Sequence, residues 1–260
     1  MLRLENIRFS YSESQKENFS ILNGLNLHVP SGEVMALIGG NGVGKTTLFN
    51  IISGLQKGFS GKIIFDGEDI TELPPHAISA KGIGRLFQGR QLMEDMTLLD
   101  NFKLASSDTT GEIPFSYLFR SSKIHQAEQK KEEQTRNILT SLFGPQCKYL
   151  NMLSVNGSKF SYGEQRMLAI ARLLMGENKL LLLDEPTSGI NPVYTKQFER
   201  IIRGLVEEQG LTVLLIEHNM HFVQAVANSC AYLEDGRIVA TGKTEDVLND
   251  PSVRNSYLGV

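Results

Sequence analysis

Cysteine is scarce in this sequence, and its placement excludes two kinds of site. The two cysteines, Cys147 and Cys230, stand alone and far apart in a chain of 260 residues. A zinc site or a dithiol redox couple needs cysteines at short, regular spacing. We therefore expect buried or incidental thiols in a reducing compartment.

An excess of positive charge is also missing. Lys and Arg number 26 against 29 Asp and Glu, which gives a net charge of -3. Nucleic-acid-binding surfaces carry clustered Lys and Arg that neutralise phosphates. The charge therefore gives no reason to expect a nucleic-acid partner.

Long apolar runs are absent as well. The longest apolar runs, such as Leu180 to Leu183 and Leu211 to Ile216, are far too short to span a bilayer. The segment from Met1 to Glu5 continues with alternating polar and apolar residues, unlike the uninterrupted apolar core of a signal peptide. We expect a cytoplasmic protein, and any membrane association must come through partners.

What the sequence does contain is the pattern of one α/β domain. It opens with strand-like segments at Leu2 to Phe9 and Leu25 to Val29. The apolar run Val34 to Ile38 ends in Gly39-Gly40, and helical spacing follows from Thr46, which predicts strand, glycine loop and helix. Two further buried strands, at Leu180 to Leu183 and Thr212 to Ile216, are bordered by helical stretches and indicate a mostly parallel sheet.

The middle of the chain differs in character. A polar stretch at Ser106 to Glu112 precedes a charged segment at Lys123 to Phe143, which predicts a helical insert with a solvated charged face. Near the end, Thr244 to Leu248 predicts a short helix, with Pro251 after it. We expect this tail to close the domain as an appendage.

The segment Gly39 to Thr46 satisfies the pattern G-x-x-x-x-G-K-[ST] between a strand and a helix, as a phosphate loop requires. Its glycines let backbone N–H groups turn toward an anion, while Lys45 reaches the outer phosphates and the Thr46 hydroxyl can ligate Mg²⁺. The alternatives are a plain glycine-rich turn and a dinucleotide fingerprint, and the latter lacks its third glycine.

Two carboxylates follow the buried strand Leu180 to Leu183. Asp184 and Glu185 should therefore lie at the carboxyl edge of the sheet, where ligands bind. Asp184 suits the Mg²⁺ shell, and Glu185 suits the polarisation of an attacking water. Such a pair is by itself a common loop start, and its combination with the phosphate loop favours the functional interpretation.

Two further polar residues follow strand-like segments. His218 follows the strand Thr212 to Ile216, and a lone histidine there is more often structural than functional. It can nevertheless hydrogen-bond a γ-phosphate. Gln88 follows the strand-like segment Ile83 to Phe87 and is uninformative alone.

Taken together and in order, these residues resemble the ATP-binding-cassette (ABC) ATPase family over essentially the whole chain. The resemblance identifies Gly39 to Thr46 as the phosphate loop, Gln88 as the glutamine switch, Ser161 to Gln165 as the signature sequence, Leu180 to Glu185 as the Walker B strand, Ser188 to Asn191 as the dimer loop and His218 as the switch histidine. Tyr11 falls where the family places an aromatic against adenine, although it could equally be a strand aromatic.

The resemblance implies the following site. Glu185, His218 and Gln88 would be catalytic, and Thr46, Gln88 and Asp184 would hold Mg²⁺. The residues expected to bind ATP are Tyr11, Gly39, Asn41, Gly42, Val43, Gly44, Lys45, Thr46, Thr47, Ser161, Gly163, Glu164 and Gln165.

Three departures from the family pattern are informative. Gly40 replaces the usual proline, Tyr162 stands where the first signature glycine is commonest, and Asn191 replaces the usual aspartate. The last two look like the subfamily that energises branched-chain amino acid importers, as do the long insert and the ending Asn255 to Gly259. Related subfamilies energise urea uptake or lipopolysaccharide export.

We therefore expect a P-loop α/β fold of the ABC type, with an N-terminal antiparallel β part and an α-helical insert. Residues 1–260 would form a single ABC ATPase domain, with the core at 1–87 and 160–260 and the glutamine switch and insert at 88–159. The resemblance implies that transmembrane permease subunits hold this chain on the inner face of the cell membrane. It also implies a head-to-tail dimer with a second ATPase subunit, identical or related.

Other classes fit the sequence less well. A lone P-loop kinase or GTPase gives no reason for the signature sequence, and a guanine-reading Asn-Lys-x-Asp segment is absent. An ABC ATPase of DNA repair or translation usually carries coiled coils, zinc modules or a second cassette, which this length does not hold. A purely regulatory nucleotide-binding module would not need Glu185 and His218.

Overall fold

A computed structural model describes residues 1–11, 19–89, 92–106 and 121–254 of the protein. The chain divides into two compact units. The first comprises residues 1–85, 179–188 and 195–260, and the second comprises residues 86–178 and 189–194. Among the described residues, no helix is both long and apolar enough to cross a membrane.

The larger sheet has six strands in the order β10-β9-β3-β8-β7-β6. These strands are β3 (Val34–Ile38), β6 (Ile83–Leu86), β7 (Leu180–Asp184), β8 (Thr212–Ile216), β9 (Ser229–Glu234) and β10 (Arg237–Lys243). β3 pairs in parallel with β8 and β9, and β7 pairs in parallel with β8. Every residue of β3, β7 and β8 is buried, as expected of parallel strands covered on both faces.

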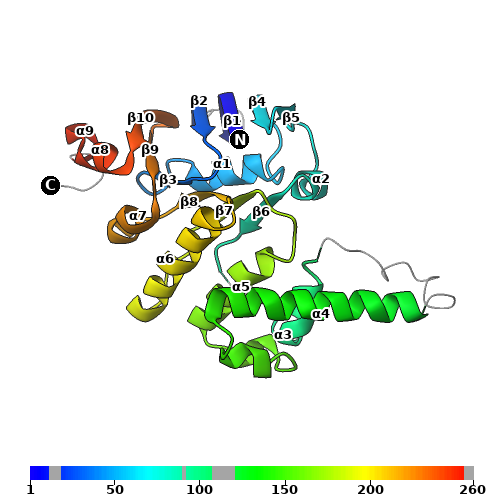
Figure 1. The fold of residues 1–260 in the computed structure, drawn as a ribbon. Coiled ribbons are helices and arrows are strands. Elements are labelled where there is room, and N and C mark those ends of the chain that lie inside the picture. Colours follow the sequence, from blue (N-terminus) through cyan, green and yellow to red (C-terminus); the bar gives the residue numbers. More distant parts are fainter. Residues whose placement is uncertain (12–18, 90–91, 107–120, 255–260) are drawn as a thin grey trace. The chain divides into compact units, whose positions relative to one another are not determined.

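The smaller sheet is antiparallel, in the order β2-β1-β4-β5. Its strands are β1 (Leu2–Tyr11), β2 (Phe19–Val29), β4 (Ser60–Phe65) and β5 (Glu68–Asp69). Helix α1 (Lys45–Ile52) lies between the two sheets (Figure 1). Its Phe49 and Ile52 join one hydrophobic core with Leu4 of β1 and Leu182 of β7. This packing holds the start of α1 at the carboxyl end of β3.

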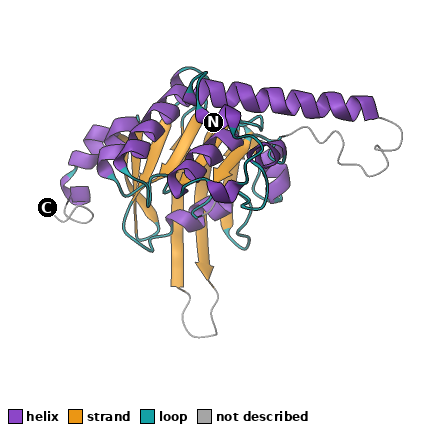
Figure 2. Cartoon of the chain, turned by 90° about the horizontal axis from the view of Figure 1, so that it is seen from below, coloured by secondary structure: helices purple, strands orange, loops and turns teal. Residues whose placement is uncertain are grey.

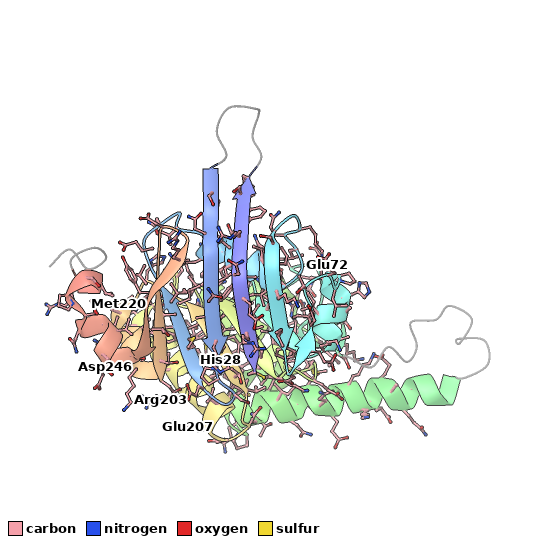
Figure 3. All side chains as sticks on the ribbon, turned by 90° about the horizontal axis from the view of Figure 1, so that it is seen from above. His28, Glu72, Arg203, Glu207, Met220 and Asp246 are labelled. Atoms are coloured by element: carbon pink, nitrogen blue, oxygen red, sulfur yellow. The ribbon has the colours of Figure 1, made fainter. Side chains whose placement is uncertain are left out.

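Two helices follow the strands β7 and β8. α6 (Pro192–Glu207) buries Phe198, Ile202 and Leu205 at the three- and four-residue spacing of an amphipathic helix. Arg203 of α6, labelled in Figure 3, donates from Nε to the carbonyl oxygen of Ala225 in α7 (Met220–Val226) at 2.8 Å. The remaining helices of this unit are α2 (Pro75–Ala80), α8 (Thr244–Asn249) and α9 (Pro251–Val253).

The second unit is built mainly from helices. Its elements are α3 (Leu98–Lys103), α4 (Ser121–Phe143), the 3-10 turns η3 (Lys148–Asn151) and η4 (Gly157–Lys159), and α5 (Tyr162–Leu173). Figure 2 shows α4 as one unbroken helix. Phe102 of α3, Leu139 of α4 and Leu168 of α5 share a second hydrophobic core.

The expected α/β fold, with an antiparallel N-terminal part and a helical insert, is what the structure has. The second compact unit is larger than the insert expected at 88–159, since it runs from Leu86 to Asn178 and also includes residues 189–194. The physical reason is that Leu168, Ala171 and Met175 pack into the core of the insert. The ending Asn255 to Gly259 and residues 107–112 of the polar stretch lie outside the described residues.

Candidate functional site

The phosphate loop (Gly39–Thr46) joins β3 to α1, and two of its glycines are required by the backbone. Gly39 has φ 154°, and a Cβ there would lie 2.3 Å from the carbonyl oxygen of Leu233. Gly44 has φ 105°, and its Cβ would lie 2.9 Å from a methyl group of Ile21. Larger residues at these positions would displace neighbouring backbone or core, so the loop shape depends on glycine.

Lys45 begins α1 and is almost fully buried, with 7% of its surface exposed. Its Nζ donates to the carbonyl oxygens of Gly39 at 2.7 Å and Gly40 at 2.6 Å. Burial lowers the pKa of Lys45, while the nearby charges of Glu185 and Asp184 oppose that shift. The structure thus brings the predicted phosphate-binding cation and both predicted carboxylates into one site.

The other predicted residues of this loop remain accessible to a ligand. Asn41, Gly42 and Thr46 are exposed, and Val43 and Thr47 are half-buried. Because Asn41 to Val43 occupy the loop between β3 and α1, their N–H groups lie beside the helix N-terminus, where anions are favoured.

Asp184 ends β7, and only 2% of its side chain is exposed. Burial raises its pKa, which an ion pair with Arg85 at 3.5 Å opposes, as does a hydrogen bond with Thr46. A hydroxyl and a carboxylate in contact are oxygen ligands of the kind that Mg²⁺ prefers. Thr46 and Asp184 therefore fit the metal role expected of them.

Arg85 on β6 was not anticipated from the sequence. Its side chain is 6% exposed, donates to the Ser53 hydroxyl at 2.9 Å and lies 5.7 Å from the ring centre of Phe49. These contacts fix the guanidinium that faces Asp184. In the sequence, Arg85 is one cation in a short strand, and nothing there indicates which carboxylate it meets.

Glu185 and His218 follow adjacent parallel strands, and the structure brings them together. His218 Nε2 lies 3.3 Å from Glu185 Oε1. The Glu185 N–H donates to the Ile216 carbonyl at 2.9 Å, which ties the end of β7 to the end of β8. Glu185 has φ 46°, a left-handed conformation that is uncommon for residues other than glycine. Such outliers concentrate at functional sites.

The signature sequence (Ser161–Gln165) forms the start of α5 in the second unit. Ser161 is the N-cap of this helix, and its hydroxyl accepts a hydrogen bond from the Glu164 N–H. The Glu164 carboxylate accepts in turn from the Ser161 N–H and hydroxyl, each at 2.8 Å. This reciprocal capping box explains a serine and a glutamate three residues apart.

Aromatic packing explains the glycine in this sequence. A Cβ at Gly163 would lie 2.5 Å from the ring of Tyr194, so only glycine allows the ring to lie against the helix. Tyr162, which replaces the commoner glycine, lies against Gly189 of the predicted dimer loop. Asn191 accepts from the N–H groups of Val193 and Tyr194 at 3.0 and 3.1 Å.

Two long side chains of α5 hold neighbouring loops of the second unit. Gln165, predicted to bind the cofactor, donates from Nε2 to the carbonyls of Gly157 and Phe160, each at 3.1 Å. Arg166, which is 1% exposed, donates to the carbonyl of Phe87 at 3.0 Å and that of Gly89 at 3.2 Å. Arg166 thereby holds the backbone on both sides of the exposed Gln88. Sequence reasoning missed Arg166.

Tyr11 lies at the end of β1 and is 45% exposed. It packs edge-on against Phe9, with ring centres 4.8 Å apart. The ring is available to stack on a ligand, and its contact with adenine stays a prediction.

The chain is similar to known proteins over most of its length. The family described as "ABC transporter" matches residues 22–188. The chain is 34% identical to the high-affinity branched-chain amino acid transport ATP-binding protein BraF of Pseudomonas aeruginosa, covering 92% of this chain and 91% of that protein. It is 35% identical to the probable branched-chain amino acid transport ATP-binding protein LivG of Archaeoglobus fulgidus. That match covers 94% of this chain and 91% of that protein.

A third relative belongs to a different transport system. The lipopolysaccharide export system ATP-binding protein LptB of Haemophilus influenzae is 33% identical over 100% of this chain and 97% of its own length. Among solved structures, an ATP-binding cassette of an ABC transporter, determined in its ADP conformation, is 31% identical in sequence and has a TM-score of 0.81. The match covers 100% of this chain and 98% of that chain.

Proposed function

Because this chain belongs to the ABC transporter family and is an ATP-hydrolysing subunit of a transporter, we propose that it energises the uptake of branched-chain amino acids. The observation that carries the enzymatic part is the convergence of Lys45, Asp184, Glu185 and His218 at the carboxyl ends of β3, β7 and β8. The proposed substrate, a branched-chain amino acid, is supported by the similarity to BraF and LivG across most of each chain.

In this mechanism the phosphate loop binds the β- and γ-phosphates of ATP, and Lys45 leaves the carbonyls of Gly39 and Gly40 to neutralise them. Glu185 accepts the proton of the water that attacks the γ-phosphate. His218, 3.3 Å from Glu185, orients that carboxylate and donates to the γ-phosphate. A bound Mg²⁺ held by Thr46, Asp184 and Gln88 would supply charge neutralisation of the phosphates.

The signature residues would serve a second copy of this chain or a related subunit. Ser161 and Gly163, with Glu164 and Gln165 holding their loop, would face the ATP of a partner cassette in a head-to-tail dimer. Tyr11 would stack on adenine. Transmembrane permease subunits would hold the dimer at the inner face of the membrane and convert its closure and reopening into transport.

Export of lipopolysaccharide is the second candidate, because LptB is similar over the full length of this chain. Two residues favour the amino acid importer, namely Tyr162 in the signature sequence and Asn191 in the dimer loop, which look like that subfamily. Uptake of urea remains an alternative of the same importer class.

The test uses membrane vesicles in which this chain is assembled with the permease subunits of a branched-chain amino acid importer. Wild-type vesicles should accumulate leucine only with MgATP and a leucine-binding protein. Lys45→Ala should abolish both MgATP binding and uptake. Glu185→Gln should bind MgATP normally but hydrolyse it about 10² to 10⁴ times more slowly, since it removes only the base.

Two outcomes would contradict the proposal. Normal MgATP affinity in a folded Lys45→Ala protein would remove the phosphate-loop assignment. Rapid ATP hydrolysis without leucine uptake, together with stimulation by lipopolysaccharide in the reconstituted complex, would replace the importer with the exporter.

A further inference from the structure

Glu217 is a buried carboxylate that the mechanism above does not use. It lies between β8 and His218, and 3% of its surface is exposed. A buried carboxylate is costly unless its oxygens accept hydrogen bonds or pair with a cation. Among the described residues the structure records no ion pair to Glu217, so hydrogen bonds hold it.

The two oxygens of Glu217 accept from two different loops. Oε1 accepts from the Thr187 N–H at 2.8 Å and from the Thr187 hydroxyl at 2.5 Å. Oε2 accepts from the N–H of His218 at 2.9 Å and from the N–H of Asn219 at 3.2 Å. One carboxylate therefore bridges the loop that follows Glu185 and the turn that bears His218.

The bridged backbone positions stand next to the reacting groups. Thr187 follows Glu185 by two residues, and His218 is itself bridged through its own N–H. The Glu185 N–H is bound to the carbonyl of Ile216, directly before Glu217. The relative position of the Glu185 and His218 side chains thus depends on main-chain segments that Glu217 connects.

We propose that Glu217 is a positioning residue for ATP hydrolysis, which holds the His218 turn against the Thr187 loop and so sets the approach of His218 to Glu185. The inference rests on the proposed function, since it assigns Glu217 to the same hydrolytic site. Small displacements of a catalytic group can reduce rates by about 10²-fold, so a rigid bridge at this place has a kinetic consequence.

Glu217→Gln tests the bridge with little change of volume. Its amide presents an NH₂ group to one pair of N–H donors, so one side of the bridge is lost. We expect kcat to fall about 10- to 100-fold, as is typical for residues that orient a reacting group, with KM and MgATP affinity unchanged. A purely structural role would lower the yield of folded protein or the affinity instead.

Thr187 offers a matched pair of milder variants. Thr187→Val keeps the shape and removes the hydroxyl donor, whereas Thr187→Ser keeps that donor. We expect a lower kcat in Thr187→Val and a wild-type kcat in Thr187→Ser. This comparison decides the question if Glu217→Gln does not fold, because equal rates in the two Thr187 variants would overturn the proposal.

A double-mutant cycle separates positioning of His218 from other effects. In a His218→Ala background, measured by single-turnover hydrolysis, Glu217→Gln should have little further effect, because the group that it positions is gone. The same fold loss in both backgrounds would overturn the proposal. So would a wild-type kcat in folded Glu217→Gln, and that result would leave the proposed function intact. A wild-type protein that binds but never hydrolyses ATP would overturn the proposed function and this inference together.

Discussion

At the scale of single residues, Lys148 and Glu164 form an ion pair at the start of the signature helix α5. Burial alone would raise the pKa of Glu164. The bond from Lys148 and those from the Ser161 N–H and hydroxyl outweigh that effect, and the net pKa lies below its usual 4.5. The bond to Glu164 raises the pKa of Lys148 above 10.5, against a smaller effect of desolvation.

These two directions define the pH range over which the pair stabilises the fold. The contribution of Glu164 is present above pH 4.5 and is lost as pH falls through its lowered pKa. The contribution of Lys148 is present below pH 10.5 and is lost as pH rises through its raised pKa. Lys148→Met should therefore reduce the free energy of unfolding between these limits.

The expected difference is at most about 1 kcal/mol, because the Lys148 side chain is 60% exposed and solvent screens the pair. Urea unfolding at a series of pH values would measure it. Lys159→Met is the control, since Lys159 is exposed and none of the described residues forms a recorded ion pair with it. A deficit in Lys148→Met that persists in strong acid would point to lost packing instead of lost charge.

At the scale of elements, α5 is shaped by the contact between Gly163 and the Tyr194 ring. Gly163→Ala would place a methyl group 2.5 Å from that ring, so the ring must move. We expect a loss of about 1 to 3 kcal/mol in the free energy of unfolding, the usual cost of overpacking. Thermal unfolding would show it as a lower transition temperature.

Gly204 in α6 is the matched control, because a Cβ there would meet nothing nearer than 3.9 Å. Gly204→Ala should stabilise the protein by about 0.5 to 1 kcal/mol through helix propensity. Adding Tyr194→Ala to Gly163→Ala should recover part of the loss. If both glycine variants behaved alike, the contact with Tyr194 would not be the cause.

The central strands of the large sheet, and the site residues that follow them, could be predicted from the sequence. Continuous apolar runs identified β3, β7 and β8, and polar residues directly after parallel strands must meet at one edge, so Lys45, Asp184, Glu185 and His218 could be placed together. Arg85, Arg166 and Glu217 could not be assigned. Their roles depend on which carboxylate or carbonyl lies opposite, and that is set by packing between segments far apart in the sequence.

At the scale of the whole molecule, the proposed pairing of two cassettes makes a testable assembly. Glu185→Gln should retain MgATP at the site and favour an ATP-dependent dimer over the wild type, provided that the chain pairs with itself. Adding Ser161→Arg should prevent that dimer by blocking the signature sequence opposite the partner's ATP. Size-exclusion chromatography with and without MgATP would measure both effects.

Ser79→Arg, an equal change on the exposed face of α2, is the control for added charge and bulk. A dimer that survives Ser161→Arg would remove the signature sequence from the interface. A Glu185→Gln protein that hydrolyses slowly but stays monomeric would indicate an obligatory partner cassette of different sequence.

The placement of β3 has a consequence for how the chain acquires its structure during synthesis. β3 is made early, yet its two neighbours β8 and β9 lie near the other end of the chain. A nascent chain that has not reached residue 212 therefore exposes both hydrogen-bonding edges of a fully apolar strand, and an unpaired strand of this kind invites association with other chains. The core of the helical insert draws on residues from Leu92 to Met175 alone, so it can form before β8 and β9 are made. Termination of synthesis after β3 and before residue 212 should therefore yield a product that aggregates. A pause in translation in the same interval would prolong the exposure of β3.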